Sequence, residues 1–278
     1  MTGSFDRAAG GTAMAAALDV PGVGLALSGG AARGIAHAGV LEVLAEAGIP
    51  VRAVAGTSAG AVVGALFASG LAPVEIGRLG VETRWSDLFR ARLPHAGLVS
   101  GAGLEHFLDR VIPARTFAEL RLPFAAVATD LETGRRVDIV SGPLARAVRA
   151  SCSLPVLLEP VSLGGRLLVD GGVSSQVPVR AVRETLGVAP VVAVDVNVGG
   201  LERPRLESPA DVGIHLAQIW TARTAGEEES QADAVIGVDA RGIALQDLSQ
   251  GVELLRRGRE AALEALPAIL ALVAGSRT

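Results

Sequence analysis

One serine in the sequence has the neighbours that a nucleophile needs. Gly56, Ser58 and Gly60 form the pattern G-x-S-x-G between an apolar run at 51–55, expected to be a strand, and one at 59–69, expected to be a helix. A serine on such a strand-to-helix turn is strained, so the residues two positions away must be small. The pattern alone also fits tight helix packing. Its position directly after a strand favours Ser58 as a nucleophile.

A serine nucleophile also needs a base and hydrogen-bond donors for the oxyanion that forms when it attacks a carbonyl. The run 28–34, S-G-G-A-A-R-G, is the donor candidate, because backbone amides without bulky side chains can converge on one oxygen. A dinucleotide-binding turn is the alternative. However, Ala31 stands where that fingerprint has its second glycine, and no acidic residue closes a second strand about 20 residues on. The run therefore favours an oxyanion loop.

Asp170 is the candidate base. It follows the run 166–169, which the glycines at 164–165 join to 161–163 in an expected hairpin. A carboxylate at the end of that second arm can project beyond the sheet edge. Asp-Gly-Gly by itself is also an ordinary turn. If the hairpin is misplaced, another carboxylate near a strand end could take this role: Asp130, Glu132 or Asp195.

The candidate residues lie next to expected strands, and strands alternate with helices along the chain. This alternation predicts an α/β protein with a mostly parallel sheet covered by helices. No low-complexity linker divides the chain, and 203–209 is the candidate hinge. The expected strands are 23–28, 51–55, 123–129 and 191–195, and the expected helices are one ending at Gly48 and those at 59–69, 144–150, 179–186, 252–257 and 260–273.

Taken together and in this order, the motifs resemble those of the patatin-like phospholipase family, bacterial branch. The likeness spans about 23–198. It implies a three-layer α/β/α fold and a Ser-Asp catalytic dyad. Five segments carry the resemblance: 29–34, 56–60, 128–134 (A-T-D-L-E-T-G), 150–155 (A-S-C-S-L-P) and 170–172.

The resemblance also implies roles for single residues. Ser58 would be the nucleophile and Asp170 the general base, and the oxyanion loop would consist of Gly29, Gly30 and Ala31 with the segment starting at Arg33. Ala31 departs from the family, which usually has a third glycine there. The implied activity is hydrolysis of lipid or phospholipid carboxyl esters through an acyl-enzyme, with no metal and no organic cofactor.

An aspartate is a weak base, so its surroundings must compensate. Its ordinary pKa near 3.9 lies about 2.6 units below that of histidine, a deficit of roughly 3.5 kcal/mol. Burial of Asp170 beside the apolar residues 167–169 should raise the pKa of its carboxyl. Hydrolysis is therefore expected to fall away at acid pH.

Two other functions remain open. His215 could complete a conventional Ser58-Asp170-His215 triad, although it lies within a helical pattern. The chain could instead be a non-catalytic relative that binds acyl chains or a partner in the same cleft. His37 and Cys152 are interpreted as packing residues, and Arg33 either steadies the oxyanion loop, meets a phosphate or lies on the surface.

Composition excludes several classes of function. All 25 basic residues are arginines, so Schiff-base chemistry, pyridoxal phosphate attachment and the lysine-bearing phosphate loop are excluded. The net charge of −4 argues against nucleic acid as a partner. The single cysteine, Cys152, allows no intramolecular disulfide and no thiolate metal cluster. A reducing, cytoplasmic compartment fits these features.

The expected organisation is a flexible segment at 1–20 and a single domain at 21–278, in which 199–278 forms a helical extension. The uncharged run 53–74 has the length of a membrane span, but its glycines and hydroxyl residues argue against one. At 84–92 basic and aromatic residues alternate, as in a solvated helix or in a lid that meets lipid. We therefore expect a cytoplasmic protein with transient membrane-surface contact. The sequence leaves its oligomeric state open.

Overall fold

The fold is built on a mixed sheet with mostly parallel strands. The structure, a computed structural model, describes residues 21–88, 100–200, 207 and 209–275. Among these residues the strands form one eight-stranded sheet in the order β5-β6-β3-β2-β1-β7-β8, with β4 also paired to β3. The strands are β1 (Val23–Leu27), β2 (Val51–Thr57), β3 (Phe124–Asp130), β4 (Arg136–Ile139), β5 (Val161–Leu163), β6 (Arg166–Asp170), β7 (Val191–Val198) and β8 (Ala234–Asp239).

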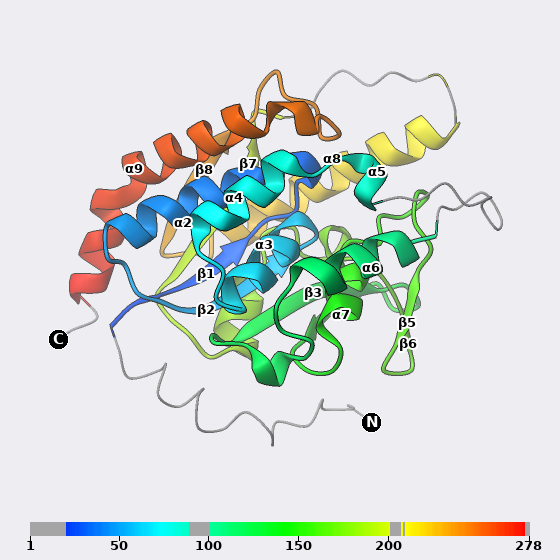
Figure 1. The fold of residues 1–278 in the computed structure, drawn as a ribbon, viewed down its shortest axis with the longest axis horizontal. Coiled ribbons are helices and arrows are strands. Elements are labelled where there is room, and N and C mark those ends of the chain that lie inside the picture. Colours follow the sequence, from blue (N-terminus) through cyan, green and yellow to red (C-terminus); the bar gives the residue numbers. More distant parts are fainter. Residues whose placement is uncertain (1–20, 89–99, 201–206, 208, 276–278) are drawn as a thin grey trace.

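Helices cover both faces of the sheet, which confirms the three-layer α/β/α fold. One apolar core lies under α2, α3, α6, α7 and α9, and a second lies on the opposite face under η4 and the end of α8. Figure 1 shows α2, α4 and α9 side by side over the first face. The helices are α2 (Ala36–Glu46), α3 (Ala59–Ala68), α4 (Pro73–Glu82), α5 (Trp85–Leu88), α6 (Ala102–Val111), α7 (Leu144–Ser151), α8 (Pro209–Glu229) and α9 (Gly251–Gly275), with short turns η1 (Ala31–Ile35), η2 (Phe117–Glu119), η3 (Gly171–Val173), η4 (Ala181–Thr185) and η5 (Leu248–Gln250).

The central strands are apolar along their whole length because helices bury both of their faces. Every residue of β1 and of β3 is buried. Strand β1 pairs in parallel with β2 on one side and with β7 on the other. The chain therefore reverses its direction of winding at β1, and ligands of open α/β sheets bind at such a point, beyond the carboxyl ends of the strands.

Strands β2 and β6 share one edge of β3 and approach each other from opposite directions. Strand β2 runs parallel to β3 and its last residue, Thr57, pairs with Val127. Strand β6 runs antiparallel and its last residue, Asp170, pairs with Ala128, the next residue of β3. The opposite edge of β3 is occupied there by β4, which pairs with both Val127 and Ala128. The register thus brings the ends of β2 and β6 together.

Part of the expectation for the C-terminal region was wrong. The region 199–278 is not purely helical, because β8 extends the sheet beside β7. The two expected helices at 252–257 and 260–273 are one helix, α9. The glycine between them does not end a helix: a Cβ atom at Gly258 would lie 2.1 Å from the carbonyl oxygen of Ala36. Gly258 instead allows α9 to approach α2 closely.

Several expectations concern residues outside the described ranges. These are the flexible segment 1–20, most of the hinge 203–209 and the second half of the lid 84–92. The uncharged run 53–74 contains α3, which has ten residues. Within the described ranges, no helix has both the length and the apolar character needed to cross a membrane.

The packing of α2 on α9 gives a stability prediction. A Cβ atom at Gly39 would lie 2.2 Å from the carbonyl oxygen of Leu255, so Gly39→Ala should lower the free energy of unfolding by about 1–3 kcal/mol. Gly226→Ala in α8 is the matched control, because apart from its chain neighbours and the adjacent backbone of its own helix no described atom lies within 4 Å of its Cβ position. Urea denaturation measures both variants. Equal stability of the two variants would contradict this packing.

Candidate active site

Ser58 lies on a strained turn between β2 and α3. Its backbone has φ 51° and ψ −119°, which places a non-glycine residue in a rarely populated region. The turn is tight on both sides: a Cβ atom at Gly56 would lie 2.3 Å from the carbonyl oxygen of Gly60, and one at Gly60 would lie 2.2 Å from that of Leu27. Gly56 and Gly60 thus have the steric role that the sequence pattern predicts.

A second serine fixes this turn. The backbone N–H of Ser58 donates to Oγ of Ser151 at 2.9 Å. The Ser151 hydroxyl in turn donates to the carbonyl oxygen of Val127 at 2.5 Å, on β3. Sequence reasoning gave Ser151 no role, although it lies in the family-like run 150–155. Its place in that run was the available signal. Ser151 is buried at the end of α7, and a buried hydroxyl needs a hydrogen-bond partner.

The carboxyl of Asp170 is buried at the end of β6 and lies next to the Ser58 side chain. Asp170 is 5% exposed, and one of its carboxylate oxygens accepts the N–H of Gly172 at 2.8 Å. Burial raises the pKa of Asp170 from 3.8 to about 6, while hydrogen bonding from Gly172 and from the Ser58 side chain acts in the opposite direction. The shift has the direction expected from the apolar sequence around Asp170.

Only part of the expected oxyanion loop has free donors. The N–H of Gly29 donates to the carbonyl oxygen of Gln176 at 3.1 Å, and that of Arg33 donates to the carbonyl oxygen of Gly30 at 3.0 Å. Within the described part of the chain, the N–H groups of Gly30 and Ala31 have no hydrogen-bond acceptor. Ala31 has φ 47°, a conformation that a glycine would adopt without strain.

The Arg33 side chain holds the loop 28–34 in place through hydrogen bonds to more distant segments. The residue is 1% exposed, and its Nε and Nη2 atoms donate to the carbonyl oxygen of Ile243 at 2.9 and 2.7 Å. Its Nη1 atom donates to the carbonyl oxygen of Gly200 at 3.0 Å. Arg33 therefore steadies the loop, as one of the sequence interpretations proposed, and it does not lie on the surface.

A cavity of about 1500 Å³ opens in front of these groups. Ser58, Asp170, Gly30 and Ala31 all line it. On one side, helices α3, α4 and α6 line it with apolar side chains, and we call this side the apolar wing: Val62, Leu66, Ile76, Leu79, Leu104 and Phe107. On the other side, β7 and α8 contribute polar side chains, and we call this side the polar wing: Asp195, Gln218, Thr221 and Glu229.

The alternative bases have other contacts. The ring of His215 lines the cavity, and its Nδ1 atom faces Gln218 of the same helix at 3.4 Å. Asp130 accepts the N–H groups of two residues that follow it in a turn, at 3.0 and 3.3 Å. Oδ1 of Asp195 accepts the backbone N–H and a side-chain Nδ2–H of Asn197. Glu132 is exposed at the same turn as Asp130. Asp170 is thus the acidic residue that these contacts place beside Ser58.

Of the other singled-out residues, His37 is buried and Cys152 is half-buried. His37 is fully buried, its Nε2 atom lies 2.9 Å from the carbonyl oxygen of Ser28, and burial lowers its pKa to about 4. Cys152 lies beside Ser58 in the cavity, and burial raises the pKa of its thiol, which keeps the thiol neutral. Among the described residues, no group of three or more His, Cys, Asp or Glu side chains could hold a metal ion.

The layered sheet, the strained serine on its strand-to-helix turn and the adjacent buried carboxyl define a three-layer α/β/α protein with a G-x-S-x-G turn. A family model described as patatin-like phospholipase matches residues 25–183. The chain belongs to the patatin-like phospholipase family, as its motifs indicated. The match includes the strands and loops that carry Ser58, Asp170 and Gly30.

Two curated relatives that match this chain are longer than it is. An uncharacterized NTE family protein of Mycobacterium tuberculosis is 37% identical over 191 residues, which are 66% of this chain and 50% of that protein. Lysophospholipase NTE1 of Cryptococcus neoformans is 34% identical over 206 residues, which are 71% of this chain and 12% of that protein. The chain thus spans half or less of these relatives. The solved structure of VipD from Legionella pneumophila shares the fold, with a TM-score of 0.55 at 15% identity, over 89% of this chain and 67% of that one.

The contact between Ser58 and Asp170 gives a prediction that is independent of any activity. Because the Ser58 side chain lowers the pKa of the Asp170 carboxyl, Ser58→Ala should raise this pKa above its wild-type value of about 6. Carbon-13 NMR titration of the Asp170 carboxyl measures the change. Ser69→Ala, at the end of α3, should leave it unchanged. A wild-type value near 4 would contradict the burial described above.

Proposed function

We propose that the chain is a serine acyl hydrolase that cleaves lipid or phospholipid carboxyl esters through a Ser58-Asp170 dyad. One observation carries the proposal: the Ser58 side chain, a buried carboxyl and two unbonded backbone N–H groups meet at one large cavity with an apolar wing. Family membership supports a lipid ester as the substrate class. The relative that is named a lysophospholipase supports the same class.

In the proposed acylation step, Asp170 takes the hydroxyl proton of Ser58 while Oγ attacks the ester carbonyl carbon. The carbonyl π electrons move to oxygen, and the N–H groups of Gly30 and Ala31 bind the resulting oxyanion. Collapse of this intermediate breaks the ester C–O bond, and the proton on Asp170 passes to the leaving alcohol. Water then repeats the sequence on the acyl-enzyme with Asp170 as the base, and releases the fatty acid.

The raised pKa makes Asp170 a better base than an exposed aspartate. At about 6, its pKa lies within about half a unit of the ordinary value for histidine. Burial therefore removes most of the difference of about 2.6 pKa units between an ordinary aspartate and histidine. Each oxyanion donor adds about 3 kcal/mol of transition-state stabilisation. A third catalytic residue is therefore not required.

The two wings of the cavity suggest how an ester lies in it. The apolar wing between α3, α4 and α6 suits an acyl chain, because burying each CH₂ group contributes about 0.8 kcal/mol. The ester carbonyl would then lie at Ser58, and the alcohol portion would extend along the polar wing of β7 and α8. Trp85 and Leu88 of α5 also line the cavity, so the described half of the expected lid borders the proposed acyl site.

The dyad predicts a specific labelling pattern. A fluorophosphonate probe should label the wild-type protein and Ser69→Ala but not Ser58→Ala, because attack requires the Ser58 oxygen. Asp170→Asn should lower kcat/KM for a fatty acyl ester by about a thousandfold, the usual contribution of a general base. Asp130→Asn and His215→Ala should retain activity. Loss of activity in folded His215→Ala would support a triad, and absence of labelling at Ser58 would support a non-catalytic acyl-binding protein.

Hydrolysis should follow the ionisation of Asp170. The carboxyl must be deprotonated to accept a proton, so log kcat/KM should fall with unit slope as the pH drops below about 6. Burial also raises the pKa values of Glu228 and Glu229 to about 7, so each must be tested as the source of the acid limb. Glu228→Gln and Glu229→Gln should leave the limb near pH 6. A flat profile down to about pH 4 would rule out Asp170 as the base.

A further inference from the structure

The carbonyl group of Gly29 is held by two side-chain amides from distant parts of the chain. Nε2 of Gln176 donates to the Gly29 oxygen at 3.0 Å. Nδ2 of Asn197 donates to the same oxygen at 2.7 Å. The two donors therefore occupy both acceptor positions of a single carbonyl oxygen.

The orientation of this carbonyl determines the orientation of an oxyanion donor. The Gly29 carbonyl and the Gly30 N–H belong to one planar trans peptide unit and point in opposite directions. The Gly30 N–H has no acceptor within the described residues, and Gly30 lines the cavity together with Ser58. We propose that Gln176 and Asn197 are positioning residues that aim the Gly30 N–H at the oxyanion. This inference rests on the proposed hydrolase function.

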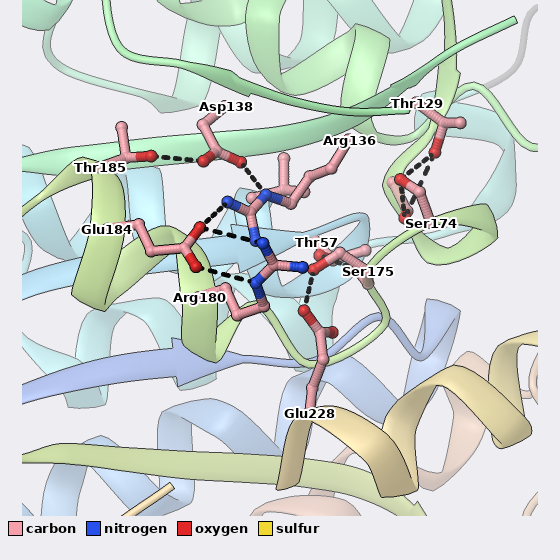
Figure 2. A network of polar contacts seen from close by, with 12 residues as sticks. Thr57, Thr129, Arg136, Asp138, Ser174, Ser175, Arg180, Glu184, Thr185 and Glu228 are labelled. Atoms are coloured by element: carbon pink, nitrogen blue, oxygen red, sulfur yellow. Dashed lines mark hydrogen bonds and ion pairs between the residues drawn. The ribbon is translucent and has the colours of Figure 1, made fainter. Parts of the chain in front are cut away.

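Gln176 is rigid because the residues on both sides of it are fixed. The buried carboxylate of Glu228 accepts the Ser175 hydroxyl at 2.6 Å and the Val177 N–H at 3.1 Å. Thr57, which directly precedes the nucleophile, donates its hydroxyl to the Ser175 carbonyl oxygen at 2.8 Å. Figure 2 shows Thr57, Ser175 and Glu228 in this arrangement. The segment 175–177 is thus hydrogen-bonded both to Thr57, next to Ser58, and to Glu228 of α8.

Asn197 is fixed in a comparable way at the end of β7. Its Nδ2 group donates one hydrogen to Gly29 and the other to Oδ1 of Asp195 at 2.9 Å, and its backbone N–H donates to the same Oδ1 atom at 3.1 Å. The backbone of Gly30 lies close to this strand, because a Cβ atom there would lie 2.5 Å from Cγ2 of Val196. Glycine at position 30 therefore allows the clamp to close.

The clamp is tested by variants that keep side-chain size and remove the donor. Gln176→Met and Asn197→Leu should each lower kcat about tenfold with little change in KM, since one retained amide still holds the Gly29 carbonyl in part. The double variant should lose about a hundredfold or more, as when one oxyanion donor is removed. The acid limb of the pH profile should stay near 6, because the pKa of Asp170 is set by burial and by hydrogen bonds from Gly172 and Ser58, not from Gln176 or Asn197. Gln250→Met, at an exposed position, is the matched control.

Two inhibitors separate an oxyanion effect from a general distortion of the site. A trifluoromethyl ketone with a fatty acyl chain forms an oxyanion when Ser58 adds to it, whereas the matching ether has no carbonyl group. The Ki of the ketone should rise in parallel with the loss in kcat, and the Ki of the ether should not change. Equal increases for both inhibitors, or unchanged kcat in folded Gln176→Met and Asn197→Leu, would overturn the clamp. An inactive wild-type protein would instead overturn the proposed function, and the clamp with it.

Discussion

The site depends on a constraint in the sheet: one edge of β3 is shared by the ends of two strands that run in opposite directions. Thr57 and Asp170 pair with adjacent residues of β3, so the residue after Thr57 must lie close to Asp170. A one-residue change in either register would turn a side chain to the other face of the sheet. Backbone pairing, rather than a flexible loop, therefore sets the distance between Ser58 and Asp170, the proposed nucleophile and base.

This arrangement has an energetic cost that the surrounding structure offsets. Ser58 and Ala31 both have positive φ values, and Asp170 has a buried carboxyl whose ionised form is disfavoured. Hydrogen bonds hold both strained turns against other parts of the fold. Ser151 holds the Ser58 turn against β3, and Arg33 holds the loop of Ala31 against the β8–α9 connection. The strain is thereby kept at the positions where the proposed reaction uses it.

Much of the fold was predictable from the sequence, because local patterns determine it. Apolar runs identified β1, β2, β3 and β7, and the paired glycines at 164–165 identified the hairpin that ends at Asp170. Features that depend on contacts between distant segments were not predictable. Gly258 lies between the helices expected at 252–257 and 260–273, but it serves close packing of α9 on α2.

The same distinction applies to the site. Ser58 and Asp170 lie in motifs with recognisable local chemistry, whereas Ser151, Gln176 and Asn197 act through partners that only folding brings near. The occupied N–H groups of Gly29 and Arg33 also follow from tertiary contacts and from the turn at η1. Sequence motifs thus pointed to the groups that are proposed to react, and the structure was needed to find the residues that are proposed to orient them.

The most direct test of the central claim is to trap the acyl-enzyme by acid quench during the first turnover of a fatty acyl ester and to map it by peptide mass spectrometry. The account predicts one acyl group, carried by the peptide that contains Ser58 and absent in Ser58→Ala. An acyl group on a different residue, or turnover without any acylated peptide, would contradict it.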